Sequence, residues 1–118
     1  MTALETRVAQ AAAQGQIAWQ RCPACGHAQA QVRPFCLACL RPDPDWQLAA
    51  GGGVVVALTV QHRAPTPDWQ ARVPYAIALV DLDEGPRVMA LAGDVSPGDR
   101  VVLRPGGLHA LPCFDRQA

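Results

Sequence analysis

The chain has 118 residues, of which half are hydrophobic and 17% are charged, so we expect one small globular domain or one domain with a stapled appendage. All ten basic residues are arginine, which excludes Schiff-base chemistry and a P-loop lysine. They balance ten acidic residues, and this zero net charge argues against a nucleic-acid-binding protein, because phosphate contacts need an excess of positive charge.

The N-terminal stretch "MTALETRVAQAAAQG" carries Glu5 and lacks the apolar segment of a signal peptide. The longest apolar run, around residues 51–60, is shorter than the ~20 residues that span a bilayer. We therefore expect a cytoplasmic protein without membrane association, in a reducing compartment where disulfides rarely persist.

Residues 3–19 contain no proline and are rich in alanine and glutamine. Their apolar side chains recur at roughly helical spacing, at Leu4, Val8, Ala11, Ala12 and Ile17. We predict an N-terminal helix over residues 1–19, weakly amphipathic and with little apolar bulk. A helix of this kind is marginal alone and needs a partner surface to dock on.

Four cysteines lie in residues 20–46 as two Cys-x-x-Cys pairs separated by ten residues: Cys22, Cys25, Cys36 and Cys39. Both sulfurs of such a turn can reach one tetrahedral centre, and the second pair completes four ligands, so we predict a zinc ribbon with one structural Zn²⁺. Four thiolates leave the ion no open position for hydrolytic chemistry. A thioredoxin-type redox couple leaves the second pair unexplained, and five cysteines are an odd number for a disulfide framework.

The residues around these pairs add detail to the prediction. Gly26 follows the first pair, where the turn needs an unhindered backbone, whereas Leu40 stands at the corresponding place after the second pair. His27 could substitute as a ligand or donate a hydrogen bond to a cysteine sulfur. Cys113 has no partner in the sequence, and we interpret it as a small hydrophobic residue of a strand.

From residue 51 onward the pattern changes to short β-branched segments separated by turns. We predict five strands, at residues 51–62, 75–82, 87–92, 100–103 and 108–114. The proline-punctuated segment 63–74 is predicted to be a long loop. Five short strands favour a small closed barrel over residues 50–118, of the OB type or, alternatively, the SH3-like type. The fold class is therefore mainly β.

Candidate catalytic residues are few: Ser96, His62, His109, Asp81, Asp83 and Glu84. The serine lies in a turn, the carboxylates cluster at a solvated hairpin, and both histidines lie in or beside predicted strands. The "GGG" of residues 51–53 precedes a strand rather than a helix, so it is not a phosphate-binding loop. We expect no catalytic residues in this chain.

Six stretches and the single residue Trp46 together resemble a known family. The stretches are "RCPACG", "RPFCLAC", "GGGVVVALTVQHR", "VPYAIALVDLDEGPRVMALA", "GDRVVL" and "LPCF". They are similar to the acyl-CoA-associated zinc-ribbon/OB-fold proteins, a domain of unknown function. That family has an N-terminal helix, a rubredoxin-like zinc ribbon and an OB-fold barrel. This chain departs from the family pattern at Leu40, where a glycine is expected, and at Ala57, where a serine is common.

The resemblance implies a non-catalytic accessory subunit of a thiolase-like enzyme, such as a thiolase, an aldolase or a ketosynthase-like synthase. It implies a heteromeric complex, a heterotetramer or larger, in which the partner supplies the catalytic residues. The small subunit would stabilise that partner and help shape the acyl-CoA site. The alternative is a single-stranded nucleic-acid-binding module, because zinc ribbons and OB barrels both serve that role.

Any contact with coenzyme A has to come from arginine, because its phosphates need cations and the chain has no lysine. The candidates are Arg33, between the cysteine pairs, and Arg63, at the end of the first barrel strand. Trp69 follows in the same loop and could stack on adenine. Alternatively, Arg63 and Trp69 pack at the partner interface, where both residue types are enriched.

Overall fold

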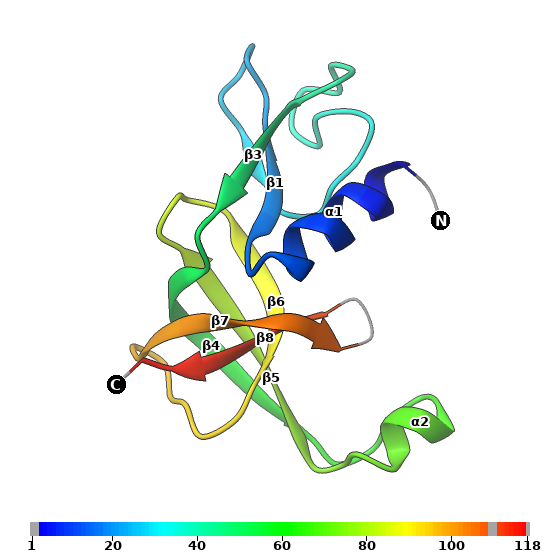
Figure 1. The fold of residues 1–118 in the computed structure, drawn as a ribbon, viewed down its shortest axis with the longest axis vertical. Coiled ribbons are helices and arrows are strands. Elements are labelled where there is room, and N and C mark those ends of the chain that lie inside the picture. Colours follow the sequence, from blue (N-terminus) through cyan, green and yellow to red (C-terminus); the bar gives the residue numbers. More distant parts are fainter. Residues whose placement is uncertain (1–2, 109–110, 118) are drawn as a thin grey trace.

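The computed structural model describes residues 3–108 and 111–117, and its principal-axis extents are 41, 31 and 26 Å. Figure 1 shows a small sheet with long loops at one end of the longest axis and a β-barrel in the other half. Helix α1 lies beside the small sheet, and the short helix α2 lies at the far end. The mainly β fold class is as predicted. Among the described residues, no helix is long and apolar enough to cross a membrane.

Helix α1 (Ala3–Ala13) is short, and Ala11 is its one buried residue. It ends where Gly15 adopts a φ of +74°, which glycine tolerates, and the N–H groups of residues 14–16 close the last turn. The helix is therefore shorter than the predicted segment 1–19, of which residues 1 and 2 lie outside the described part. After Gly15 the chain turns back and continues as a strand.

The small sheet is antiparallel, with strand order β2-β1-β3. Its strands are β1 (Ile17–Arg21), β2 (Ala28–Gln29) and β3 (Asp45–Ala49). Strand β1 is central, and its three middle residues are all buried. Trp19 belongs to the core cluster of the barrel. Gln20 points to the opposite face, as the alternation along a strand requires, and contacts the loops that carry the cysteines.

The barrel closes in the order β4-β5-β6-β8-β7, and β7 pairs with β4. Its strands are β4 (Gly52–Gln61), β5 (Tyr75–Leu82), β6 (Arg87–Ala92), β7 (Arg100–Leu108) and β8 (Leu111–Arg116). All pairs are antiparallel except β6 with β8. This arrangement is a five-stranded barrel of the OB type, so that prediction is confirmed and the SH3-like alternative is not needed.

Close packing of β4 on β5 explains why the first barrel strand starts with glycine. At Gly53 an added Cβ atom would lie 2.7 Å from the carbonyl oxygen of Asp81 and 2.7 Å from Val80 Cγ1. Only glycine allows the two backbones to approach so closely. The barrel core consists mainly of small and β-branched side chains, together with Phe114 from β8.

Two barrel segments differ from the sequence prediction. Strand β7 runs to residue 108 rather than 103, and residues 109 and 110, including His109, lie outside the described residues. The predicted loop 63–74 contains helix α2 (Pro67–Gln70), whose N-cap is Thr66. The Thr66 hydroxyl accepts a hydrogen bond from the Trp69 N–H, and a proline occupies the first turn. A threonine followed by a proline is a helix-start signal that the loop interpretation overlooked.

Candidate metal centre

The two Cys-x-x-Cys pairs adopt equivalent turns, which we call the first cysteine turn (residues 22–27) and the second cysteine turn (residues 36–41). In the first, Gly26 N–H donates to the Cys22 carbonyl at 2.9 Å, and in the second, Leu40 N–H donates to the Cys36 carbonyl at 2.8 Å. Each turn is closed by a further bond, from Cys22 N–H to the His27 carbonyl at 3.0 Å and from Cys36 N–H to the Arg41 carbonyl at 2.7 Å. The sequence repeat is therefore a structural repeat.

The four sulfur atoms of Cys22, Cys25, Cys36 and Cys39 lie within 4.8 Å of one another and could hold a metal ion. Two distances across the turns, Cys22 to Cys39 and Cys25 to Cys36, are both 3.6 Å. These distances are far longer than the ~2.05 Å of a disulfide. They are close to the ~3.8 Å between sulfurs around a tetrahedral ion with Zn–S bonds of ~2.3 Å. Among the described residues, the cluster contains these four cysteines and not His27.

Backbone N–H groups favour thiolate at the first cysteine of each turn. The pKa of Cys22 is lowered to about 7, chiefly by the N–H of Cys25 and then by that of Ala24, against the effect of burial. At Cys36 burial raises the pKa, but the N–H groups of Cys39 and Ala38 outweigh it and the net direction is down. An acceptor sulfur that already receives these hydrogen bonds is ready to act as a metal ligand.

Cys25 behaves in the opposite way. The N–H of His27 lowers its pKa, but burial and the three neighbouring cysteine sulfurs outweigh that effect and raise the pKa to about 11. A fourth negative charge among three other sulfurs is unfavourable unless a cation is present. The donor set therefore fits a divalent ion that binds thiolates.

A buried pair of glutamines holds the second cysteine turn in place. Gln20 and Gln29 lie opposite each other on β1 and β2 and are only 1% and 5% exposed. Gln29 Nε2 donates to Gln20 Oε1 at 2.8 Å and to the Phe35 carbonyl at 3.1 Å, and its Oε1 accepts from Leu37 N–H at 2.9 Å. Gln20 both donates to the Arg33 carbonyl, at 2.8 Å, and accepts from the Arg33 N–H, at 2.9 Å.

This glutamine pair does for residues 33–37 what a neighbouring strand does in a sheet, because it binds the backbone at every second residue. Cys36 lies between Phe35 and Leu37, whose backbones Gln29 holds directly. Neither glutamine is predictable from the sequence as part of the site, because their spacing carries no metal signal and glutamine is most often a surface residue.

The two arginines predicted to contact coenzyme A do not lie together. Arg33 belongs to the loop before the second cysteine turn, whereas Arg63 follows β4 and precedes α2, at the opposite end of the longest axis (Figure 1). One phosphate group cannot contact both side chains. The side chain of Arg33 donates to the carbonyl of its neighbour Val32 at 2.9 Å.

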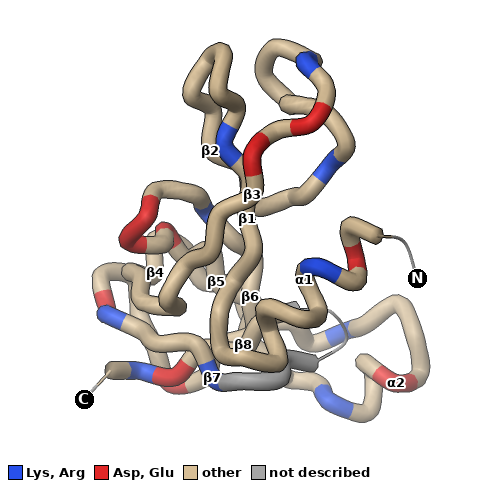
Figure 2. Tube along the Cα trace, turned by 45° about the horizontal axis from the view of Figure 1, so that its top comes forward, with Lys and Arg blue, Asp and Glu red and all other residues tan. Residues whose placement is uncertain are grey.

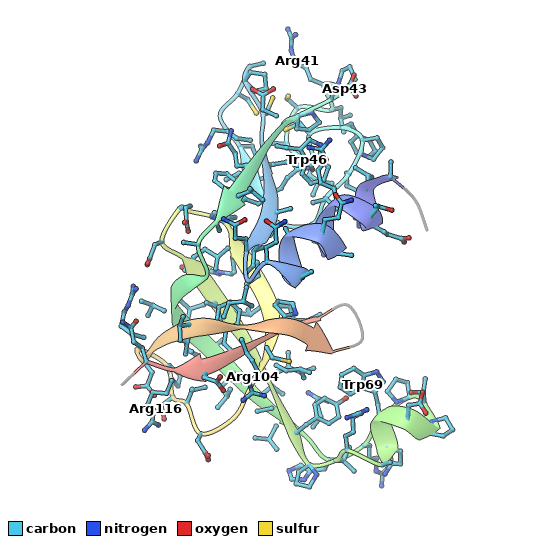
Figure 3. The ribbon with its side chains drawn as sticks, viewed as in Figure 1. Arg41, Asp43, Trp46, Trp69, Arg104 and Arg116 are labelled. Carbon is cyan, nitrogen blue, oxygen red and sulfur yellow. The ribbon has the colours of Figure 1, made fainter. Side chains whose placement is uncertain are left out.

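Trp69 of α2 packs on Tyr75 of β5, with ring centroids 4.9 Å apart. Both rings line a hollow of about 600 Å³ between the α2 segment and the barrel, together with Arg72, Arg104 and the half-buried Cys113. Figure 3 shows Trp69 on α2 and Arg104 on the barrel. The arginines that line this hollow are thus Arg72 and Arg104, neither of which the sequence predicted there, and not Arg63.

Charged residues are spread over the molecule rather than gathered on one face (Figure 2). Four arginines of the barrel are paired with carboxylates, as Arg87–Asp81, Arg100–Asp83, Arg104–Asp115 and Arg116–Asp99. The hydrogen bond from Arg87 lowers the pKa of the Asp81 carboxyl, and that from Arg100 does the same for Asp83. In the part of the chain that the structure describes, the barrel charges thus compensate one another, whereas a nucleic-acid-binding groove needs excess cations.

Residues 46–107 match the model of a family described as the C-terminal OB-fold domain of ChsH2. The chain is 36% identical over 88 residues to a probable enoyl-CoA hydratase alpha subunit of Thermomonospora curvata. It is 34% identical over 80 residues to a DUF35 domain-containing scaffold protein of Methanocaldococcus jannaschii. These alignments cover 75% and 67% of this chain but only 27% and 56% of the two relatives. The chain therefore spans about a quarter and about half of their lengths.

Two solved structures have the same fold. One chain of the Ltp2-ChsH2(DUF35) aldolase has a TM-score of 0.72 and 31% sequence identity, over 98% of this chain and 96% of that chain. A DUF35-family protein of unknown function from Sulfolobus solfataricus has a TM-score of 0.66 over 95% of this chain and 84% of that chain. Its sequence identity is 17%, so this second likeness shows the fold alone.

The glutamine pair generates a first prediction. A Gln29→Met variant leaves the Phe35 carbonyl and the Leu37 N–H without their partner, so we expect it to lower the free energy of unfolding by about 1–3 kcal/mol. Exchange of the Leu37 amide with solvent should become at least tenfold faster. The control is Gln31→Met, an exposed glutamine of the same loop, which should change stability by less than about 0.5 kcal/mol. A Leu37 amide that exchanges at the wild-type rate in Gln29→Met would contradict this role.

Proposed function

The chain belongs to the ChsH2 C-terminal OB-fold family, as its motifs predicted, and we propose that it is a non-catalytic accessory subunit of a thiolase-like acyl-CoA enzyme. The observation that carries this proposal is the likeness to a chain of the Ltp2-ChsH2(DUF35) aldolase, which extends over nearly the whole of both chains. The DUF35 domain-containing scaffold proteins among the relatives support a role in an assembly, and the hydratase subunit supports a link to acyl-CoA chemistry.

Several candidate catalytic residues already take part in ion pairs or turn hydrogen bonds, and this supports a non-catalytic role. Asp81 and Asp83 form ion pairs with arginines at the barrel surface. The backbone N–H of Ser96 is held by the Asp99 carboxylate at 2.8 Å, which is the geometry of a turn. A carboxylate that is exposed and paired with arginine is a poor general base, because its pKa lies below its usual range.

The proposed subunit carries one structural Zn²⁺, held by Cys22, Cys25, Cys36 and Cys39. Support comes from the distances between the sulfurs and from the thiolate-stabilising N–H groups described above. When bound, the ion would supply cross-links between the two cysteine turns. Because four thiolates fill its coordination sphere, it would offer no position to water or substrate.

The proposal is tested by co-expression with a thiolase-like enzyme, chosen from the genes that neighbour the gene of this chain. We expect the two proteins to co-purify as one heteromeric particle, a heterotetramer or larger, whose acyl-CoA activity needs both components. Failure to form a complex, combined with acyl-CoA turnover by the small protein alone, would overturn the proposal. Binding to single-stranded oligonucleotides that weakens steeply with salt would favour the nucleic-acid alternative instead.

We expect the purified protein to contain one zinc ion per chain by metal analysis. A Cys25→Ser variant should lose the ion and unfold at lower denaturant concentration, because the free energy of metal binding is also free energy of folding. Cys113→Ser is the matched control, since Cys113 lies outside the cluster, and it should keep its zinc. A Cys25→Ser protein with a full equivalent of zinc and unchanged unfolding would falsify the assignment.

The subunit is further proposed to bring cations to the acyl-CoA site or to the interface around it. Arg33 and Arg63 remain the predicted residues, and Arg72 joins them because it lines the hollow beside Trp69 and Tyr75. None of the four ion pairs among the described residues involves these three arginines. Their charge is therefore available to a phosphate or to a partner carboxylate.

Contact with a coenzyme phosphate and contact with the partner enzyme can be separated in the assembled complex by three variants, Arg63→Ala, Arg72→Ala and Arg33→Ala. Loss of a charge-assisted hydrogen bond to a coenzyme phosphate should raise the KM for acyl-CoA about tenfold while the complex stays intact. Arg100→Ala is the control, because its guanidinium is already paired with Asp83. Dissociation of the complex would assign these arginines to the interface, and unchanged KM and assembly would remove both roles.

A further inference from the structure

The two cysteine turns differ at one position that matters energetically. Each needs a residue with positive φ after its last cysteine, and the first turn uses Gly26, with a φ of +80°. The second uses Leu40, with a φ of +66°. A leucine pays a steric penalty in this region that glycine does not. Leu40 is also 70% exposed, so no burial of its side chain within the chain offsets that strain.

Two more large apolar side chains are exposed on the same loop. Phe35 is 37% exposed and Leu37 is 41% exposed. The loop is compact because a β-bridge joins Phe35 to Pro42 and because the bonds of the second cysteine turn close it further. We call residues 35–42 the apolar tip. Strain and apolar exposure at one place together mark an interaction site more strongly than either does alone.

The charges beside the apolar tip restrict what can bind it. Arg41 lies within it and Asp43 directly follows it, and Figure 3 shows both at the end of the molecule opposite α2. Neither takes part in the four ion pairs among the described residues, so both can pair with groups of a binding partner. One charge of each sign gives no net attraction for an anionic lipid surface or a nucleic acid.

The size of the tip also excludes a self-sufficient dimer contact. A standard protein interface buries about 800 Å² on each partner. Three partly exposed side chains provide much less, so the tip can serve only as one part of a larger interface. A few residues buried near the centre of such an interface contribute most of its binding energy, and polar residues lie around them at the rim.

We propose that the apolar tip inserts into an apolar recess of the thiolase-like partner enzyme, with Leu40 as the central side chain and Arg41 and Asp43 at the rim. This inference rests on the proposed function, because it uses the same partner. It concerns a residue by which this chain departs from the family pattern. Glycine at position 40 would give a more stable free subunit that binds its partner more weakly.

The experiment compares the free subunit and the reconstituted complex for Leu40→Gly and Leu40→Asn. Asparagine tolerates positive φ and has a similar size, but it is polar. We expect Leu40→Gly to raise the Tm of the free subunit by about 4 °C. Both variants should weaken binding to the partner enzyme about tenfold in titration calorimetry. The control is Met89→Gln, which removes an apolar side chain that is 52% exposed on β6 of the barrel and should leave binding unchanged.

The outcomes are distinguishable. If wild-type protein binds the enzyme and both Leu40 variants bind within twofold of it, the apolar tip is not in the interface, while the proposed function stands. If wild-type protein does not bind the enzyme at all, the proposed function fails and this inference fails with it. Weaker binding by Met89→Gln to the same degree would also overturn the inference, because the effect would then not be specific to the tip. If both Leu40 variants instead change the oligomeric state of the free subunit, the apolar tip binds a second copy of this chain and the inference is wrong.

Discussion

The convergence of four cysteine sulfurs within 4.8 Å is the constraint on which the N-terminal half of the molecule depends. Between residues 20 and 46, the buried side chains are amides, thiols and one proline rather than large apolar groups: Gln20, Cys22, Gln29, Cys36 and Pro44. Apolar burial is the main stabilising term in small domains, and here it contributes little. Bonds between a metal and thiolates, together with buried amide hydrogen bonds, would take its place in the proposed zinc form.

The ribbon is fixed to the barrel through β1. Trp19 packs in the barrel core, and the Arg21 guanidinium lies 4.9 Å from the centre of the Trp19 ring. The same guanidinium donates to the Gly26 carbonyl at 3.0 Å. A continuous set of contacts thus runs from the barrel core to the first cysteine turn. Because of it, a metal bound by the cysteines would stabilise the position of the ribbon on the barrel as well as the ribbon itself.

The sequence predicted best those features that depend on local spacing, namely the cysteine cluster and the five barrel strands. Features that arise from tertiary pairing were missed. Ile17 continues a helical apolar spacing, but pairing with β3 makes residues 17–21 a strand. Gln20 and Gln29 are nine residues apart, and only the pairing of β1 with β2 brings their amides together. Arg72 lines the hollow beside Trp69 because of the course of the segment between α2 and β5, which no periodicity indicates.

Leu40 keeps a positive φ because several hydrogen bonds fix the backbone of the second cysteine turn. Leu40 N–H is bound to the Cys36 carbonyl at 2.8 Å, and Cys36 N–H to the Arg41 carbonyl at 2.7 Å. The Leu37 N–H donates to Gln29 Oε1 at 2.9 Å. A loop ordered in this way before binding loses little conformational entropy when a partner covers it. The rigidity that brings four thiols together is therefore the same rigidity that keeps an apolar side chain exposed in one orientation, so the candidate metal centre and the proposed docking surface depend on one set of hydrogen bonds.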